Sequence, residues 1–168
     1  MTIPYAYVAN AASGTVSVVS TSTNTVVKTV KVGSGPNDVA ITPNGSYAYV
    51  ANAGSTTVSV IKTSSNTVVK TVKVGTSPGG IAINPNGTYA YVANFGSNTV
   101  SVISTSTNTV VKTVKVGSVP GWVAITPNGS DAYVTNQSSN TVSIVNISTN
   151  MVVKTVRAGD QPQGIAIT

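Results

Sequence analysis

The chain has 168 residues, with nine Lys and Arg, three Asp, and no Glu, His or Cys, so its net charge is +6 and its charged fraction is 7%. The lack of His, Cys and Glu argues against a zinc site of the usual type and a disulfide framework. No cofactor is expected. No apolar run approaches the roughly 18 residues of a membrane span. Residue 1 leads directly into repeat sequence, so no signal peptide is predicted in this chain.

The first element in chain order is the hexapeptide at Tyr5–Asn10, which recurs at Tyr47–Asn52, Tyr89–Asn94 and, in altered form, Asp131–Asn136. The spacing is always 42 positions and divides the chain into the copies 1–42, 43–84, 85–126 and 127–168. A period of this length is typical of four-stranded propeller blades. We therefore expect a single repeat domain over 1–168.

Each copy reads as four short strands. In the second copy, apolar and β-branched residues predict strands over 47–52, 57–61, 68–74 and 80–83. Polar turns separate them, and Asn86-Gly87 predicts a hairpin turn in which both residues have positive φ. The sequence therefore predicts an all-β chain of antiparallel four-stranded blades.

The ordered motifs Pro-x-Gly-Ile-Ala-Ile, Pro-Asn-Gly, Tyr-Val-Ala-Asn and Asn-Thr-Val-Ser-Val-Ile resemble the YVTN β-propeller repeat, and the fourth copy reads Tyr-Val-Thr-Asn at 133–136. The resemblance implies a propeller like those of microbial, notably archaeal, surface-layer and cell-surface proteins. It also implies an extracellular parent protein, with the strand at 80–83 innermost and the lysine strand outermost. It implies no single activity, because a fold alone does not determine function.

The 42-residue copies do not begin at the same strand as such blades. The chain begins with a second strand at Tyr5 and ends with an innermost strand at 164–167. We expect residues 164–167 to pair with the three-stranded segment at 5–32, because an unpaired edge promotes aggregation. Pairing within one chain closes four blades, and pairing between two chains closes eight. Rings of about seven blades, implied by the resemblance, favour the eight-bladed homodimer.

Cations gather on one predicted strand of each copy. We expect a basic rim on the outermost strands, formed by Lys28, Lys31, Lys70, Lys73, Lys112, Lys115, Lys154 and Arg157. Charges on edge strands prevent association between sheets, which is our preferred interpretation. Binding to an anionic polymer or lipid is the alternative. A nucleic-acid partner is not predicted, because the tyrosines lie on another strand and are expected in the core between blades.

Copies two and three match at 32 of 42 positions, and half of the differences fall in the loops 53–56 and 95–98 and in the loops 76–80 and 118–122. In an antiparallel blade these loops share one end of the strands, which we call the varied face. Loops on a rigid scaffold often bind ligands, although drift after duplication explains the same variation. The candidate ligand-binding residues are Asp38, Phe95, Trp122, Gln137, Asp160 and Gln163.

Sequons for N-glycosylation occur at Asn44, Asn86, Asn128, Asn136 and Asn146. Catalysis is not expected, because general acid–base chemistry needs neighbouring titratable groups and the three Asp occupy unrelated repeat positions. We expect a non-catalytic structural or interaction module of a microbial cell surface. The alternatives are a ligand- or glycan-binding disc with a glycan or protein partner, an engineered or fragmentary repeat array, and a lactonase-like or quinone-dependent enzyme.

Overall fold

The computed structural model describes residues 4–168 and is all-β, with 15 strands and no helix in that range. Blade 1 contains β1 (Tyr5–Asn10), β2 (Thr15–Ser20) and β3 (Thr25–Lys31). Blade 2 contains β4 (Pro36–Ile41), β5 (Tyr47–Asn52), β6 (Thr57–Lys62) and β7 (Thr67–Lys73). Blade 3 contains β8 (Pro78–Ile83), β9 (Tyr89–Asn94), β10 (Thr99–Ser104) and β11 (Thr109–Lys115). Blade 4 contains β12 (Pro120–Ile125), β13 (Asp131–Asn136), β14 (Thr141–Asn146) and β15 (Met151–Arg157).

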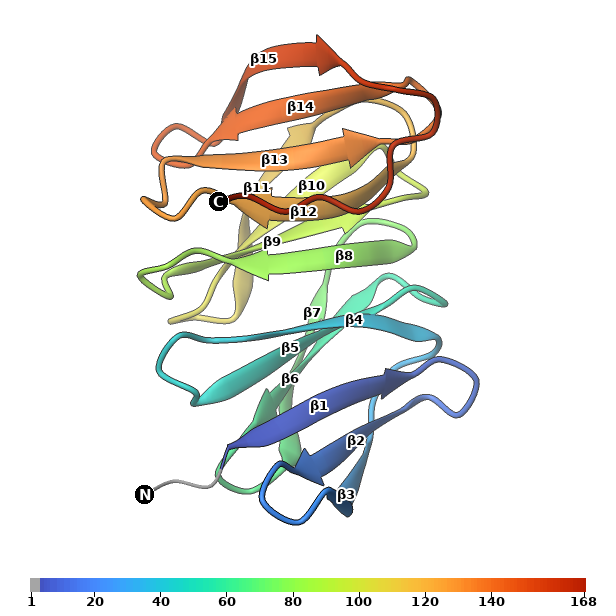
Figure 1. The fold of residues 1–168 in the computed structure, drawn as a ribbon, viewed down its shortest axis with the longest axis vertical. Helices are drawn as coiled ribbons and strands as arrows, with labels where there is room; N and C mark the ends of the chain where they lie inside the picture. The colour runs from blue at the N-terminus through green and yellow to red at the C-terminus, as the bar shows by residue number, and fades with distance from the viewer. Residues whose placement is uncertain (1–3) are drawn as a thin grey trace.

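Each blade is an antiparallel meander whose strands pair in chain order, so β4, β8 and β12 lie at one edge and β3, β7, β11 and β15 at the other. The inner strand β8 contacts both β4 and β12. The blades succeed one another along the long axis of the molecule, with blade 1 and blade 4 at opposite ends (Figure 1). This is the arrangement of a partial propeller, which confirms the predicted fold class.

The core lies between blades. The forward face of each blade, which points toward the next blade, presents a tyrosine and valines. The rear face of the next blade meets it with alanine, valine and isoleucine. Between blades 2 and 3, for example, Tyr49, Val58 and Val60 pack against Ala90, Val92 and Ile103, and all six are fully buried. Because one blade cannot bury both faces, stacking blades is what removes this apolar surface from water.

Tyrosine hydroxyls bridge adjacent blades. Tyr7 donates to Asn66 Oδ1 at 2.6 Å, Tyr91 donates to Asn150 Oδ1 at 2.7 Å, and Tyr49 donates to Asn108 in the same way. Burial raises the pKa of Tyr49 to about 12, so its hydroxyl stays protonated and can donate. Each acceptor asparagine takes a positive φ in the turn between the two outer strands, a conformation that Asn tolerates better than most residues.

The Asn-Gly turns differ from the expected hairpin type. Gly45, Gly87 and Gly129 have φ near 70°, whereas the asparagines before them are not among the residues with positive φ. Gly87 N donates to Asn84 O at 2.8 Å, which closes a turn around Pro85 and Asn86. Proline presets φ near −65° and favours the first central position of a type I turn. The prediction of positive φ at both residues is therefore wrong at the asparagine.

Residues 164–167 form no strand in the described chain, and β2 is the only strand that pairs with β1. The alternative of a four-bladed ring closed within one chain is therefore not formed in the described structure. The reason is geometric, because the inner strands β4, β8 and β12 advance along an open array that leaves blade 1 far from blade 4 (Figure 1). Closure by a second chain is taken up below.

No helix among the described residues is long and apolar enough to cross a membrane.

Candidate functional site

The loops of the varied face lie together at one end of the strands. The loop that precedes each inner strand packs on the loop that follows the neighbouring second strand. Phe95 N donates to Ser77 O at 3.0 Å, and Gln137 N donates to Val119 O at 2.9 Å. The prediction that the two variable loops share one end is confirmed, and a backbone ladder holds them in place.

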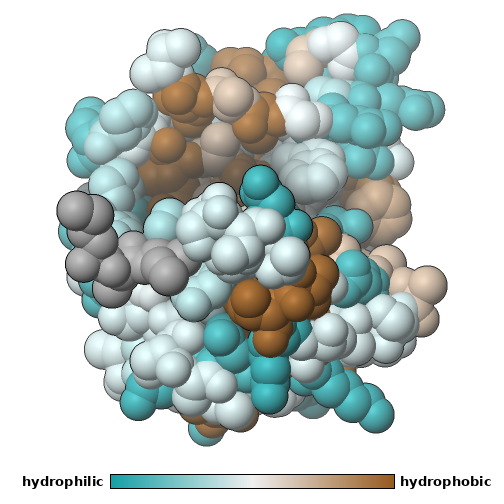
Figure 2. All heavy atoms as spheres, turned by 60° about the horizontal axis from the view of Figure 1, so that its bottom comes forward, coloured by the Kyte–Doolittle hydropathy of each residue, from teal (hydrophilic) through white to brown (hydrophobic). Residues whose placement is uncertain are grey.

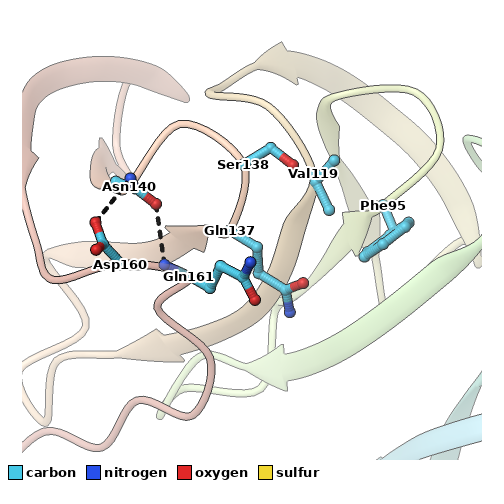
Figure 3. A pocket seen from close by; sticks show the side chains of 7 residues that line it. All are labelled: Phe95, Val119, Gln137, Ser138, Asn140, Asp160 and Gln161. Atoms are coloured by element: carbon cyan, nitrogen blue, oxygen red, sulfur yellow. Dashed lines mark hydrogen bonds between the residues drawn. The ribbon is translucent and has the colours of Figure 1, made fainter.

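A depression of about 630 Å³ lies on this face where blades 3 and 4 meet. Its lining contains one aromatic ring, one aliphatic side chain and several amide, hydroxyl and carboxylate groups, from Phe95, Val119, Gln137, Ser138, Asn140, Asp160 and Gln161. Figure 3 shows the Phe95 ring on one side, with Gln137 between it and Gln161. The sequence-predicted residues Phe95, Gln137 and Asp160 are therefore brought together.

The loop after β15 is held against blade 4 by one asparagine. Asn140 Nδ2 donates to Asp160 Oδ1 at 3.1 Å, and Gln161 N donates to Asn140 Oδ1 at 2.9 Å (Figure 3). Phe95 is 44% exposed. The fixed polar rim and the accessible ring allow a ligand to combine stacking with hydrogen bonds.

Three residues that line the depression have positive φ: Asn140 at 55°, a conformation that Asn tolerates, and two residues that tolerate it less well. Val119 has φ 57° and Gln161 has φ 48°, at the repeat position where the first copy carries Gly35. A β-branched residue in this region is unusual and costs of order 1–3 kcal/mol. Val119 N donates to Asn98 Oδ1 at 2.8 Å, which helps to hold the strained loop. Val119, Ser138, Asn140 and Gln161 were not among the residues predicted from the sequence, although the copies differ at these positions.

Asp38 does not line the depression. It lies on β4, where its carboxylate accepts hydrogen bonds from Val39 N at 2.8 Å and from Ile81 N at 2.9 Å. Burial raises the pKa of Asp38, and the two backbone hydrogen bonds oppose that shift. Because Ile81 belongs to β8, the carboxylate links the inner strands of blades 2 and 3.

Trp122 and Gln163 also lie outside the depression. Trp122 is on β12, and a Cβ added at Gly80 would lie 2.8 Å from its Cα, so β8 and β12 approach closely there. Gln163 is exposed in the segment after β15. The six candidates therefore divide into three that gather and three that do not.

The family described as "Lactonase, 7-bladed beta-propeller" matches residues 5–165 of the chain. The chain belongs to this lactonase propeller family. Among solved structures, it is similar to a chain of Kuenenia stuttgartiensis hydrazine synthase, with 30% sequence identity and a TM-score of 0.88. That similarity covers 95% of this chain and 47% of the other, so the chain spans about half the length of this relative. No curated protein matches it.

In this lactonase-family propeller, all eight cations of the predicted basic rim are exposed on the outermost strands β3, β7, β11 and β15. This placement agrees with the sequence-based expectation. The exposed edge of each blade therefore carries positive charge, which disfavours pairing with the edge of another propeller.

The sequons of the propeller have different surroundings. Asn44, Asn86 and Asn128 are exposed in the turns after a proline, and Asn146 is half-buried. Asn136 is fully buried and its Nδ2 donates to Thr141 and Ser143. Asn136 is therefore out of reach of a modifying enzyme once the chain has folded.

The carboxylates of this family member do not converge. Asp38 bonds the backbone of blades 2 and 3, and Asp160 bonds Asn140. Asp131 accepts a hydrogen bond from Ser130 Oγ at 2.7 Å. Within residues 4–168, no group of three His, Cys, Asp or Glu side chains could hold a metal ion. The depression contains one carboxylate and no second acid or base in its lining.

Proposed function

We propose that this lactonase-family propeller is a non-catalytic interaction module that binds a neutral glycan in the depression between blades 3 and 4. The observation that carries the proposal is the lining itself, in which Phe95 faces a rim of amide groups from Gln137, Asn140 and Gln161. An aromatic ring offers an apolar surface to the C–H face of a sugar. Amides both donate and accept hydrogen bonds, as sugar hydroxyls require.

The cell surface is the proposed location of the parent protein. The YVTN-like motifs support it, because similar repeats occur in surface-layer and cell-surface propellers. The exposed sequons Asn44, Asn86 and Asn128 are compatible with it. The expected structural role is to present the varied face from a rigid array of blades.

Lactone hydrolysis is the second candidate, and the family description favours it. Such a reaction needs a group that activates water or attacks the carbonyl carbon. Asp160 is the only carboxylate in the depression, and it accepts a hydrogen bond from Asn140. We therefore expect no hydrolysis of γ-butyrolactone above the rate in buffer, and turnover that D160S abolishes would favour the enzyme instead.

The binding proposal is tested with single substitutions that restore residues present in other copies. Phe95 and Gln137 occupy a position that carries Ala11 and Ala53 in the first two copies, so Phe95→Ala and Gln137→Ala are compatible with the fold. The wild-type chain is screened on an array of neutral oligosaccharides, and the strongest hit is measured by titration calorimetry. We expect F95A to weaken that binding about tenfold or more, since an aromatic contact contributes roughly 1 kcal/mol beyond its buried area.

Met151→Thr is the matched control. It restores the threonine of the other copies on β15, at a residue outside the depression, and leaves the affinity unchanged. Equal affinities for wild type and F95A, or no bound sugar on the array, would contradict the proposed site.

A further inference from the structure

No described residue covers the rear face of blade 1, although the same face is buried in every other blade. Val8 on β1 is 47% exposed, whereas Val50, Val92 and Val134 at the same repeat position are fully buried. Figure 2 turns this end of the array toward the viewer and shows hydrophobic side chains on its surface. This end therefore presents one half of an interface that the chain uses three times internally.

The forward face of blade 4 is the other half. Tyr133, Val142 and Val156 are half-buried there. Their counterparts in blade 3, Tyr91, Val100 and Val114, belong to the buried core that meets blade 4. The two ends of the array therefore carry the two kinds of apolar face that pack against each other between its blades.

The tyrosine bridges identify the same missing contact. Each bridge joins a tyrosine to an asparagine 59 positions later, in the next blade. Tyr133 is the fourth tyrosine of the series, and its hydroxyl has no hydrogen bond within residues 4–168. The fourth asparagine of the series is Asn24, which accepts no tyrosine hydroxyl in the same range and has the same positive φ as Asn66, Asn108 and Asn150. The unused donor and the unused acceptor lie at opposite ends of the array.

A glycine contact repeats this pattern. A Cβ added at Gly33, Gly75 or Gly117 would collide with the side chain of Asn52, Asn94 or Asn136, because glycine packs on the buried asparagine of the next blade. At Gly159, the fourth member of the series, an added Cβ would meet no atom within 4 Å in the described chain. The matching asparagine, Asn10, is only half-buried.

An inner strand is the last missing part. Within residues 4–168, blade 1 has no inner strand, and a groove of about 460 Å³ lined partly by Tyr5, Tyr7 and Ile41 lies beside β1. In the complete interfaces, Ala40 and Ala82 of the inner strands pack against the core, whereas the core between blades 1 and 2 has no such alanine. Ala166 has the same repeat position, and residues 164–167 carry the inner-strand sequence without forming a strand.

We propose that two copies of this chain close an eight-bladed ring, in which residues 164–167 of each copy form the inner strand of blade 1 of the other. The pairing of Val39 with Val50 and of Ala40 with Tyr49 sets the register. Ile165 then lies opposite Val8 of the partner, and Ala166 opposite Tyr7. Head-to-tail contacts close into a ring when the rotation that relates one subunit to the next is a whole fraction of 360°. Four blades are about half of a ring in a seven-bladed family, so two copies come close to a full turn. This proposal is independent of glycan binding.

Disulfide trapping tests the register. The chain has no cysteine, so Val8→Cys and Ile165→Cys introduce one pair at directly opposed positions, where Cα atoms of paired strands lie about 4.5–5.5 Å apart. This separation fits a disulfide. We expect the oxidised double variant to run as a covalent dimer on a non-reducing gel and as a monomer after reduction.

The control is Val8→Cys with Ala166→Cys, which places the second thiol on the other face of the strand and should give little covalent dimer. An intrachain disulfide, equal trapping by both pairs, or no trapping by the V8C/I165C pair would overturn the proposal. A second measurement needs no cysteine. Tyr133→Phe should raise the dimer dissociation constant roughly 5- to 100-fold, since two bridges are lost per dimer. Tyr47→Phe should leave it unchanged, and an equal effect of both variants would contradict the bridge to Asn24.

Discussion

Replacing Tyr91 with Ala should lower the free energy of unfolding by about 3–5 kcal/mol. The side chain is fully buried between blades 3 and 4, where it packs with Val100, Val123 and Val134. Truncation leaves a cavity at the interface and also removes the hydrogen bond to Asn150. Urea titration followed by circular dichroism measures the loss.

Two milder variants separate the parts of this effect. Tyr91→Phe keeps the ring and removes only the bridge to the half-buried Asn150, so the loss should fall to about 0.5–1.5 kcal/mol, the net contribution of one hydrogen bond. Tyr89→Phe, on the same strand, removes a hydroxyl that has no hydrogen bond in the described chain and should have little effect. Equal losses for Y91F and Y89F would show that the bridge contributes nothing to the contact between blades.

Replacing Asn94 with Ala should destabilise the chain by about 2–4 kcal/mol. Asn94 is fully buried, and its Nδ2 donates to Thr99 Oγ1 at 3.1 Å and to Ser101 Oγ at 2.9 Å. Gly75 packs directly on the Asn94 side chain, so the amide also holds the segment that connects β7 to β8. The substitution removes both hydrogen bonds and leaves a void beside the glycine. Thermal unfolding of the variant measures the cost.

Asn86→Ala is the control for this prediction. Asn86 is exposed in a turn, and its Oδ1 accepts hydrogen bonds from Thr88 that water can replace. Its loss should cost less than about 1 kcal/mol. If N94A were as stable as N86A, the buried asparagine would not be the anchor that its contacts indicate.

Most of the fold was predictable because the repeat shows each element several times. The strand expected at 47–52 is β5 itself, and the other strands of that copy differ from the prediction by at most two residues at an end. The turn at Pro85 was misjudged because the Asn-Gly pair was considered without the proline before it. Closure within one chain was left open, since a sequence does not reveal the angle between successive blades.

The candidate site was only partly predictable. Variation among copies selected Phe95, Gln137 and Asp160, which the structure brings to one depression. It also selected Asp38 and Trp122, whose positions on inner strands place them elsewhere. Chain order cannot distinguish these two groups, because a loop and the strand that follows it are adjacent in sequence. The depression also depends on Asn140, whose bonds to the loop after β15 are long-range contacts.

We infer that the two ends of this array are the two halves of the interface that joins its blades. Sedimentation equilibrium of the 168-residue chain at micromolar concentration tests it most directly. We expect a mass twice that of the 16.9 kDa chain, and for the Tyr133→Phe variant we expect this mass to fall to that of a single chain at higher dilution. A mass of 16.9 kDa for the wild-type chain, or a series of growing assemblies, would contradict it.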